Sequence, residues 1–307
     1  MLPSFLPNAG ALFSRLPRIL RRHRLMTLWM KLTREDPIQP VQIRRDSPGF
    51  VDLREGVLRL IVVEGEFEPE FFQIADVLLA NGGHFFDVGA NHGLLSFGLA
   101  ARWSDRVTFH LFEPNPKLIA TIKRSISLYP RMQVSLNPIA VSDFEGEVHI
   151  AFNDSHSGES YVTSDGGTSV RCHQLDNYLA EQKIDEVTLL KIDVEGFELA
   201  ALRGLSKSLQ ERKVKALYFE YCEKWLSRHH PPMDLIQFLQ SCGYLVFYCR
   251  PQDLSRFGDR CISYRPSQNS APVLLAPISG TVLPSATDLL AIPEDLVARF
   301  AIAEPQG

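Results

Sequence analysis

The segment Phe85-Phe86-Asp87-Val88-Gly89-Ala90-Asn91-His92-Gly93 constrains the fold of this 307-residue chain more than any other. Two aromatic residues and a valine form a short apolar run that is typical of a buried parallel strand, and the run ends in an acid, two glycines and an asparagine. An apolar helical pattern resumes at Leu94. We therefore predict a strand, a tight turn and a helix over about residues 92–102.

The two glycines make this turn suitable for binding a ligand. Gly89 and Gly93 can adopt backbone conformations that other residues avoid, and they let the chain approach a ligand closely. The free N–H groups at the start of the following helix point over the turn. Asp87, at the carboxyl end of the strand, would repel a pyrophosphate but attract a cation or a hydroxyl group. The turn therefore favours a nucleotide-like cofactor with an ammonium or sulfonium; the alternative is that the glycines only form a tight turn.

The dinucleotide-binding fingerprint G-x-G-x-x-G is not met. It requires glycines at positions 91 and 94, which are Asn91 and Leu94 in this chain. A nucleotide-dependent oxidoreductase on the same fold is therefore a weak alternative.

The composition excludes several classes of protein. Hydrophobic residues make up 45% of the chain, which is ample for a core, and the net charge of −4 disfavours a general nucleic-acid-binding protein. We thus predict no nucleic-acid partner. The five cysteines show neither C-x-x-C pairs nor zinc-site spacing, which indicates reduced thiols in a cytoplasmic protein. No apolar run reaches the roughly 18 residues of a transmembrane helix.

The first 34 residues contain seven arginines and lysines and no acid, with apolar residues near one helical face. The arginines interrupt the apolar stretch that a secretory signal would need. Three interpretations stay open: residues 11–34 dock on an anionic membrane surface, form an organellar transit peptide, or pack as a helix on their own domain. Residues 35–50 are rich in proline and polar groups, which is typical of a linker.

These patterns divide the chain into three parts. We predict a basic amphipathic segment with its linker over residues 1–49, a catalytic domain over residues 50–276 and a tail over residues 277–307. At the start of the domain, residues 51–63 predict one or two strands and residues 68–79 a helix.

Four further segments predict buried strands that are followed by polar residues. Residues 107–112 precede Glu113, residues 134–141 precede Ser142 and Asp143, residues 187–192 precede Asp193, Glu195 and Glu198, and residues 214–219 precede Glu220. Strands over residues 244–248 and 272–276 would complete the sheet. Because open α/β sheets bind ligands at the carboxyl ends of their strands, we expect these polar residues to surround one site.

The polar residues at the strand ends suggest individual roles. Glu113 follows Gly93 by 20 positions, the interval at which a mononucleotide-binding unit holds an acid against the ribose hydroxyls. Burying the acids after residue 192 costs several kcal/mol unless they are paired or bound, and Lys191 is one candidate partner. Unused acids would only destabilise the fold, which disfavours a second alternative, a non-catalytic binding module. Residues 153–169, with His156, form either a solvated connection or a cover over the substrate.

Four blocks of the sequence resemble FkbM-type S-adenosylmethionine-dependent methyltransferases over about residues 50–276. The blocks are D-V-G-A-N-H-G at 87–93, F-E-P-N at 112–115, A-V-S-D at 140–143 and L-K-I-D-V-E-G-F-E at 190–198. The resemblance implies an α/β, Rossmann-like methyltransferase fold: a seven-stranded, mostly parallel sheet with its last strand antiparallel and helices on both faces. It also implies O-methylation of a hydroxyl group, often on a sugar or a polyketide.

The resemblance assigns the cofactor-binding residues for S-adenosylmethionine. Those that would line the methionine part are Asp87, Gly89, Asn91 and Gly93. Glu113 would hold the ribose hydroxyls, and Ser142 and Asp143 would meet the adenine.

The chemistry of methyl transfer to oxygen requires mainly an oriented hydroxyl and a group that takes up its proton. The candidate bases are Asp193, Glu195, Glu198, Glu220 and His156. We predict that Glu195 or Asp193 takes the proton and that no metal is needed; the alternatives are that Glu198 only satisfies backbone N–H groups and that the acids hold a divalent metal. The acceptor would be a small molecule or a glycan, and we favour a sugar assembled at a membrane.

Overall fold

The computed structural model describes residues 28, 32, 36–44, 46–55, 58, 67–153, 160–163, 166–249, 262–264, 273–278 and 283–297. Apart from two exposed leucines, Leu28 and Leu32, the basic segment over residues 11–34 lies outside this part of the chain, and so does His156. The predictions of membrane docking and of a base at residue 156 therefore stay predictions. No helix in the described ranges is long and apolar enough to cross a membrane.

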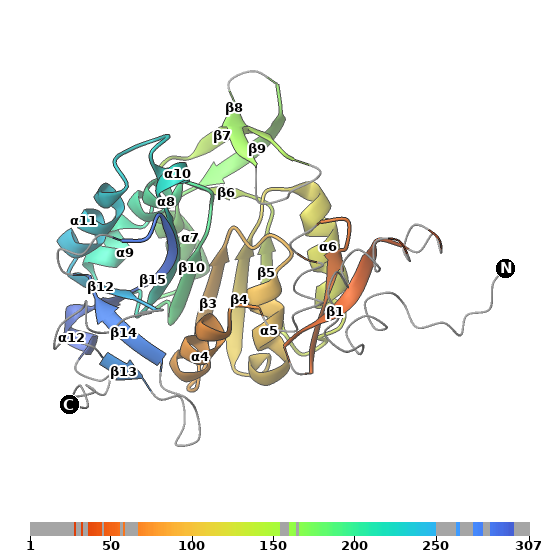
Figure 1. Cartoon of the computed structure of the whole chain (residues 1–307), viewed down its shortest axis with the longest axis horizontal. Helices are drawn as coiled ribbons and strands as arrows, with labels where there is room; N and C mark the ends of the chain where they lie inside the picture. Colours follow the sequence, from red (N-terminus) through yellow and green to blue (C-terminus); the bar gives the residue numbers. More distant parts are fainter. Residues whose placement is uncertain are drawn as a thin grey trace.

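A central sheet organises the molecule (Figure 1). Its order is β13-β14-β12-β15-β11-β10-β3-β4-β5. The strands are β3 Gly83–Val88, β4 Val107–Phe112, β5 Gln133–Asn137, β10 Leu189–Ile192, β11 Leu217–Cys222, β12 Tyr244–Tyr248, β13 Ile262–Tyr264, β14 Val273–Pro277 and β15 Ala286–Pro293. The strands β11, β10, β3, β4 and β5 pair in parallel, and β15 is antiparallel to both β11 and β12. The seven strands from β12 to β5 confirm the predicted fold class.

The antiparallel strand among these seven differs from the one that we expected. We predicted it over residues 272–276, but the strand near that position, β14, extends the edge of the sheet beyond β12. The strand between β11 and β12 is β15, which lies in residues that we interpreted as a tail. Residues 289–292 of β15 are fully buried. A strand buried on both faces is apolar throughout and lacks the alternation that reveals a half-exposed strand.

The predicted linker also contains regular structure. β1 Ile38–Arg44 and β2 Ser47–Asp52 form an antiparallel hairpin that packs on α5 Leu94–Trp103. Val41 and Ile43 of β1 point into the core, as does Val51 of β2. The alternation of these residues was present in the sequence, but the prolines between them favoured a linker. Proline is compatible with β1 because the hairpin has no further strand to which β1 must donate.

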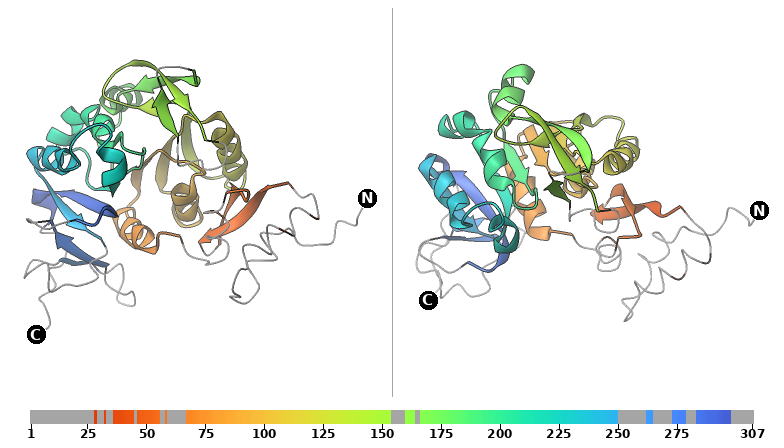
Figure 2. Two further views of the ribbon diagram at one scale, coloured as in Figure 1. Left: turned by 45° about the horizontal axis from the view of Figure 1, so that its top comes forward. Right: turned by 90° about the horizontal axis from the view of Figure 1, so that it is seen from above.

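Helices cover both faces of the sheet (Figures 1 and 2). The predicted helices after and before β3 are confirmed as α5 and α4 Pro69–Leu78, and α6 Pro116–Ile126 follows β4. The other helices are α7 Leu175–Gln182, α8 Glu198–Arg203, α9 Ser206–Gln210, α10 Glu223–Leu226, α11 Met233–Ser241 and α12 Glu294–Val297. Successive residues of β3 point to opposite faces of the sheet and so belong to two hydrophobic cores. Phe85 packs with α4 and α5 on one face, and Phe86 packs with α7 on the other.

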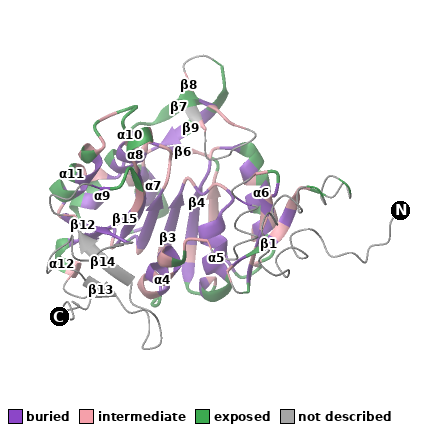
Figure 3. Ribbon diagram, viewed as in Figure 1, coloured by how far each residue is buried: buried purple, intermediate pink, exposed green. Residues whose placement is uncertain are grey.

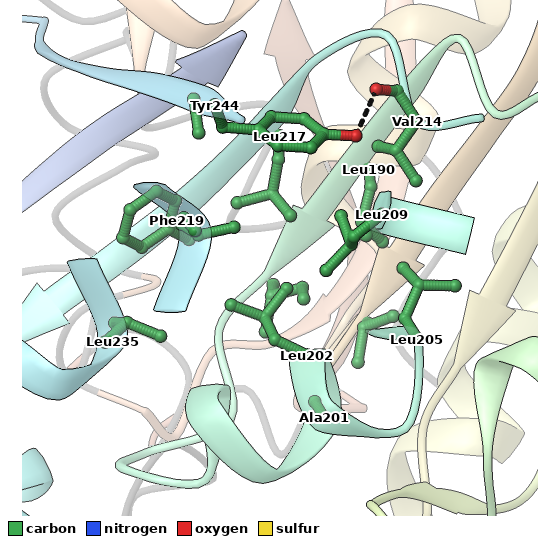
Figure 4. Packing of buried hydrophobic residues seen from close by; sticks show 14 of the residues in the cluster. Leu190, Ala201, Leu202, Leu205, Leu209, Val214, Leu217, Phe219, Leu235 and Tyr244 are labelled. Atoms are coloured by element: carbon green, nitrogen blue, oxygen red, sulfur yellow. Dashed lines mark hydrogen bonds between the residues drawn. The ribbon is translucent and has the colours of Figure 1, made fainter. Parts of the chain in front are cut away.

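The second of these cores fixes the position of β10 and β11. Leu190 and Leu217 pack against leucines of α8, α9 and α11, which Figure 4 shows from close by. The hydroxyl of Tyr244 donates a hydrogen bond of 2.7 Å to the carbonyl oxygen of Val214 inside this cluster. The strands β3, β4, β10, β11, β12 and β15 are accordingly buried along most of their length (Figure 3). The site at their carboxyl ends therefore stands on a close-packed base.

A second, four-stranded sheet lies beyond the carboxyl ends of the central strands, at the top of Figure 1. Its strands are β6 Ala140–Val141, β7 Gly146–Ala151, β8 Tyr161–Thr163 and β9 Thr168–His173, in the order β6-β9-β7-β8. We call this sheet the cover. The third strand predicted from residue 134 is thus divided between β5 in the central sheet and β6 in the cover.

Asp76 of α4 ties the N-terminal hairpin to the domain. Its Oδ2 accepts a hydrogen bond of 2.6 Å from Arg44 of β1 and one of 2.7 Å from Arg102 of α5, and its Oδ1 accepts one of 3.0 Å from Trp103. Burial alone would raise the pKa of Asp76, but the hydrogen bonds from Arg44 and Trp103 and the charges of both arginines hold the pKa below its usual value of 3.8.

We expect Asp76→Asn to lower the free energy of unfolding by about 2 kcal/mol at pH 7, because charge-assisted hydrogen bonds to a mostly buried carboxylate are lost. Since the folded-state pKa is lowered, this stabilisation is present above the ordinary carboxyl pKa and disappears as the pH falls through the folded-state value. Urea denaturation at pH 7 and at pH 3 would measure the difference. Asp105→Asn, at an exposed acid, is the matched control, and an equal loss in both variants would contradict the assignment.

Candidate active site

A cavity of about 280 Å³ lies where the carboxyl ends of β3, β4 and β10 face the cover. The strand ends contribute its polar residues. The cover contributes the apolar side chains of Val148, Ile150 and Val162, and Phe144 and Phe152 on either side of β7 line the cavity as well. An apolar wall opposite a polar one suits a flat, partly apolar ligand such as a nucleoside.

The turn after β3 has the geometry that its glycines predict. Gly89 and Gly93 both have φ of +72°, and a Cβ added to Gly89 would lie 1.9 Å from the carbonyl oxygen of Asp193. Residue 89 must therefore be glycine for the turn to pack against the end of β10. Of the four residues predicted to line a cofactor here, Gly89 and Asn91 line the cavity.

The other two predicted residues of this turn, Asp87 and Gly93, are not among the residues that line the cavity. Asp87 is 1% exposed, and its Oδ2 accepts a hydrogen bond of 2.6 Å from the Ser96 hydroxyl at the start of α5. Its Oδ1 has no hydrogen-bond partner but lies 3.6 Å from the Nζ of Lys191. Asp87 is thus buried under the turn, where it contacts Ser96 of α5 and Lys191 of β10.

Lys191 connects this turn to the acids after β10, as the sequence suggested. Its buried Nζ donates a hydrogen bond of 3.0 Å to the carbonyl oxygen of Gly89 and lies 3.4 Å from Oδ2 of Asp193. Burial favours the neutral amine, but the charges of Asp193 and Asp87 outweigh it and raise the pKa of Lys191. The lysine is therefore charged and holds the two strand ends together.

Glu113 presents a fixed carboxylate to the cavity. It is 5% exposed and lines the cavity, its Oε2 accepts a hydrogen bond of 2.8 Å from the N–H of Asn91, and its Oε1 accepts one of 2.8 Å from the N–H of Asn115. Burial raises its pKa to about 7, and the two backbone hydrogen bonds limit the rise. Each oxygen can still accept a second hydrogen bond. Two neighbouring hydroxyls of a ligand could donate these two hydrogen bonds to Glu113.

The two residues predicted to meet an adenine differ in position. Ser142 lines the cavity, and its N–H donates to the carbonyl oxygen of His173 at 3.1 Å. Asp143 is exposed and is not among the lining residues. Its backbone carbonyl accepts a hydrogen bond of 2.7 Å from the Gln174 side chain, which holds this segment beside β9. The structure therefore brings Ser142, but not Asp143, to the cavity wall.

The predicted catalytic acids gather where β10 ends beside β11. Glu220, which we expected after a strand over residues 214–219, lies within β11 because this strand continues to Cys222. Asp193 and Glu195 line the cavity. Glu195 has φ of +53°, a conformation that non-glycine residues rarely adopt and that is common at functional sites. Glu220 does not line the cavity, but burial, followed by the charges of Asp193, Glu195 and Glu198, raises its pKa to about 8.

Glu198 has a structural task in this site. Its Oε1 accepts hydrogen bonds of 3.0 and 3.1 Å from the N–H groups of Val194 and Gly196, and its side chain is 1% exposed. This supports the alternative that Glu198 satisfies backbone N–H groups, which belong to the turn before α8. Burial raises the pKa of Glu198 to about 7.

The cover is the part of the site that sequence reasoning missed. Residues 147–152 alternate like those of an exposed strand, but Val148 and Ile150 of β7 line the cavity. Ser160 and Val162, from the loop that we regarded as either a connection or a cover, also line it. One signal in the sequence could have revealed that these two segments line the site. Both carry apolar residues, whereas the other predicted site residues are mostly acids.

The antiparallel strand β15 lies between β11 and β12, and five of the seven strands pair in parallel in the order β11-β10-β3-β4-β5 on one side of it. This sheet order defines the class of Rossmann-like methyltransferases. The tight glycine turn after the central strand and the carboxylate at the end of its neighbour agree with this class.

Comparison with known proteins identifies the family. The methyltransferase FkbM domain matches residues 87–246, which is just over half of the chain. This chain belongs to that family.

Two curated methyltransferases are similar in sequence to this chain. The hexuronic acid methyltransferase AglP of Haloferax volcanii is 27% identical over 166 residues, covering 52% of this chain and 60% of AglP. The 2-O-methyltransferase NoeI of Sinorhizobium fredii is 25% identical over 186 residues, covering 53% of this chain and 73% of NoeI. A crystal structure of a methyltransferase FkbM from Methylobacillus flagellatus is 16% identical with a TM-score of 0.41, covering 88% of this chain and 58% of that one.

Proposed function

We propose that this chain is an S-adenosylmethionine-dependent O-methyltransferase that acts on a hydroxyl group of a sugar in a glycan, a glycolipid or a natural product. The observation that carries the proposal is the carboxylate of Glu113, buried on the wall of a cavity whose opposite wall is apolar. Such a carboxylate can accept hydrogen bonds from both hydroxyls of a ribose, while the apolar wall suits an adenine ring. The descriptions of the two relatives, one for hexuronic acid and one for a 2-O position, support a sugar acceptor.

The residues around Glu113 would hold the rest of the cofactor. Gly89 and Asn91 are assigned to its methionine part and Ser142 to its adenine, since all three line the same cavity. Asp87 and Gly93 act on the cofactor through the shape and charge of the turn. Asp143 keeps a peripheral role near the adenine.

When bound, S-adenosylmethionine would supply an electrophilic methyl group on its sulfonium for the acceptor oxygen, with S-adenosylhomocysteine as the leaving group. The protein must orient the acceptor hydroxyl and take up its proton. Asp193 and Glu195 are assigned to this task because they line the cavity next to the turn at Gly89. Glu220 does not line the cavity, but one of its carboxylate oxygens lies within 4.8 Å of one of Asp193.

A thermal-shift titration of the whole chain tests the proposal. S-adenosylhomocysteine at a hundred times its dissociation constant should stabilise the protein by about 2.7 kcal/mol and raise Tm by about 5 °C or more, and NAD should leave Tm unchanged. A rise with NAD alone would favour the oxidoreductase. Binding of S-adenosylhomocysteine without transfer of a radiolabelled methyl group to any of a panel of sugars, hexuronic acids included, would favour the non-catalytic binding module.

A further inference from the structure

Three carboxylates outside the cofactor-binding residues converge at one point. Asp193, Glu198 and Glu220 each contribute an oxygen, and these oxygens lie within 4.8 Å of one another. The register of β10 and β11 explains the contact, because Ile192 pairs with Phe219 and the next residues, Asp193 and Glu220, are therefore neighbours. Oxygens bound to a common Mg²⁺ or Ca²⁺ are at most about 4–5 Å apart, given metal–oxygen distances of roughly 2.0–2.6 Å.

The buried oxygen of Glu198 provides an independent indication of a ligand. Oε1 of Glu198 already accepts the N–H groups of Val194 and Gly196, whereas Oε2 is buried and has no hydrogen-bond partner. An unpaired carboxylate oxygen on a side chain that is 1% exposed costs several kcal/mol unless something binds it.

The described residues do not balance the negative charges around this point. Among the described residues, Lys191 is the cation that forms an ion pair with a member of the cluster, Asp193, and the same lysine also serves Asp87 and the carbonyl oxygen of Gly89. Glu198 and Glu220 form no ion pair with a described residue. A divalent cation would supply the missing positive charge.

We infer that Asp193, Glu198 and Glu220 bind one divalent cation of the oxygen-preferring kind, Mg²⁺ or Mn²⁺. This inference takes up the alternative of a divalent metal in place of our prediction that no metal is needed. Three protein oxygens leave coordination positions open, and Asp193 lies on the cavity wall, so these positions face the space available to an acceptor.

The inference rests on the proposed function for its role: the cation would hold two neighbouring oxygens of the acceptor sugar, one of them the nucleophile. It would also lower the pKa of that hydroxyl. Glu195, which lines the cavity but is not a member of the cluster, is then the acid left to take the proton.

Titration of the whole chain with Mn²⁺, followed by the electron paramagnetic resonance signal of free Mn²⁺, tests the site without any need for activity. We expect saturable binding of about one ion per chain, and at least about tenfold weaker binding in Asp193→Asn and in Glu220→Gln. Glu223→Gln is the matched control, because it removes an exposed negative charge three residues from Glu220 without removing a ligand, and it should bind Mn²⁺ as the wild type does. Glu198→Gln, if it folds, should weaken binding as well.

The inference is overturned if the wild type shows no saturable Mn²⁺ binding up to millimolar concentrations, or if Asp193→Asn and Glu220→Gln bind as tightly as the wild type. Calorimetry with S-adenosylhomocysteine on the same samples separates this result from the proposed function. Cofactor binding without Mn²⁺ binding would remove the cation site only, and Mn²⁺ binding without cofactor binding would remove the proposed function while the cation site stands.

Discussion

Glu113→Ala should lower the affinity for S-adenosylhomocysteine by about 2–3 kcal/mol, or roughly 30- to 150-fold. Two hydroxyls facing one carboxylate form charge-assisted hydrogen bonds, and the low exposure of Glu113 leaves little water to replace it. Asp143→Ala should weaken binding far less, because Asp143 is exposed and lies outside the cavity wall. Calorimetry on the three proteins measures these differences.

A fold-integrity control is needed, because Glu113 also holds the N–H groups of Asn91 and Asn115. Circular dichroism and the unfolding midpoint of Glu113→Ala should identify any variant that has lost its structure, and Glu186→Ala, at an exposed acid of the same type, gives the baseline. Unchanged affinity in folded Glu113→Ala would remove Glu113 from the site.

The raised pKa of Glu113 adds a pH dependence to the same prediction. Burial raises this pKa to about 7, so the carboxyl is protonated in the free protein at pH 6 and charged at pH 8. Hydroxyl donors prefer the charged form. We therefore expect wild-type affinity to rise between pH 6 and pH 8 with release of a proton on binding, and Glu113→Ala to lack this rise.

Glu195→Gln and Asp193→Asn should each lower turnover by at least about a hundredfold and leave cofactor affinity nearly intact. A positioned base contributes 10²–10⁴-fold, and Asp193, as a ligand of the inferred cation, would help to orient the acceptor. Both side chains line the cavity next to the turn at Gly89 and are distinct from the residues assigned to the ribose and adenine. Initial rates of methyl transfer at saturating cofactor, together with calorimetry, separate turnover from binding. Glu223→Gln should keep full activity.

The two variants differ in what else they lose. Asp193→Asn should also lose Mn²⁺ binding, whereas Glu195→Gln should keep it and lose the rise of rate with pH that a titrating base produces. Full activity in both variants would refute the assignment of the base. Activity that is abolished by EDTA and restored by magnesium would agree with the cation site at Asp193, Glu198 and Glu220.

The sequence by itself determined the local elements of the site. The run from Phe85 to Gly93 predicts strand, turn and helix, and the structure has β3, a turn with Gly89 and Gly93 at φ of +72°, and α5. The acids at 113, 193 and 220 were expected at one edge because parallel strands end together. Glu113 and Asp193 directly follow β4 and β10, whereas Glu220 lies within β11, in register with the residue after β10. These features follow from short-range patterns and from one topological rule, so they needed no tertiary information.

The tertiary structure decided which strands neighbour each other. β15 lies between β11 and β12, and residues 38–52 form a hairpin on α5. A fully buried strand such as β15 has no periodic pattern that marks its place, and its partners come from segments distant in the sequence.

The tertiary structure also decided the surroundings of each acid. Asp193, Glu195, Glu198 and Glu220 were all candidate bases in the sequence, but register and backbone conformation separate them. Glu195 lines the cavity at a positive φ, Glu198 is buried against backbone N–H groups, and Glu220 lies close to Asp193 without lining the cavity. Side-chain direction depends on strand register and on the packing of neighbouring elements, which are long-range properties. Local sequence patterns can therefore predict that acids gather at an edge, whereas only the packed fold fixes the task of each one.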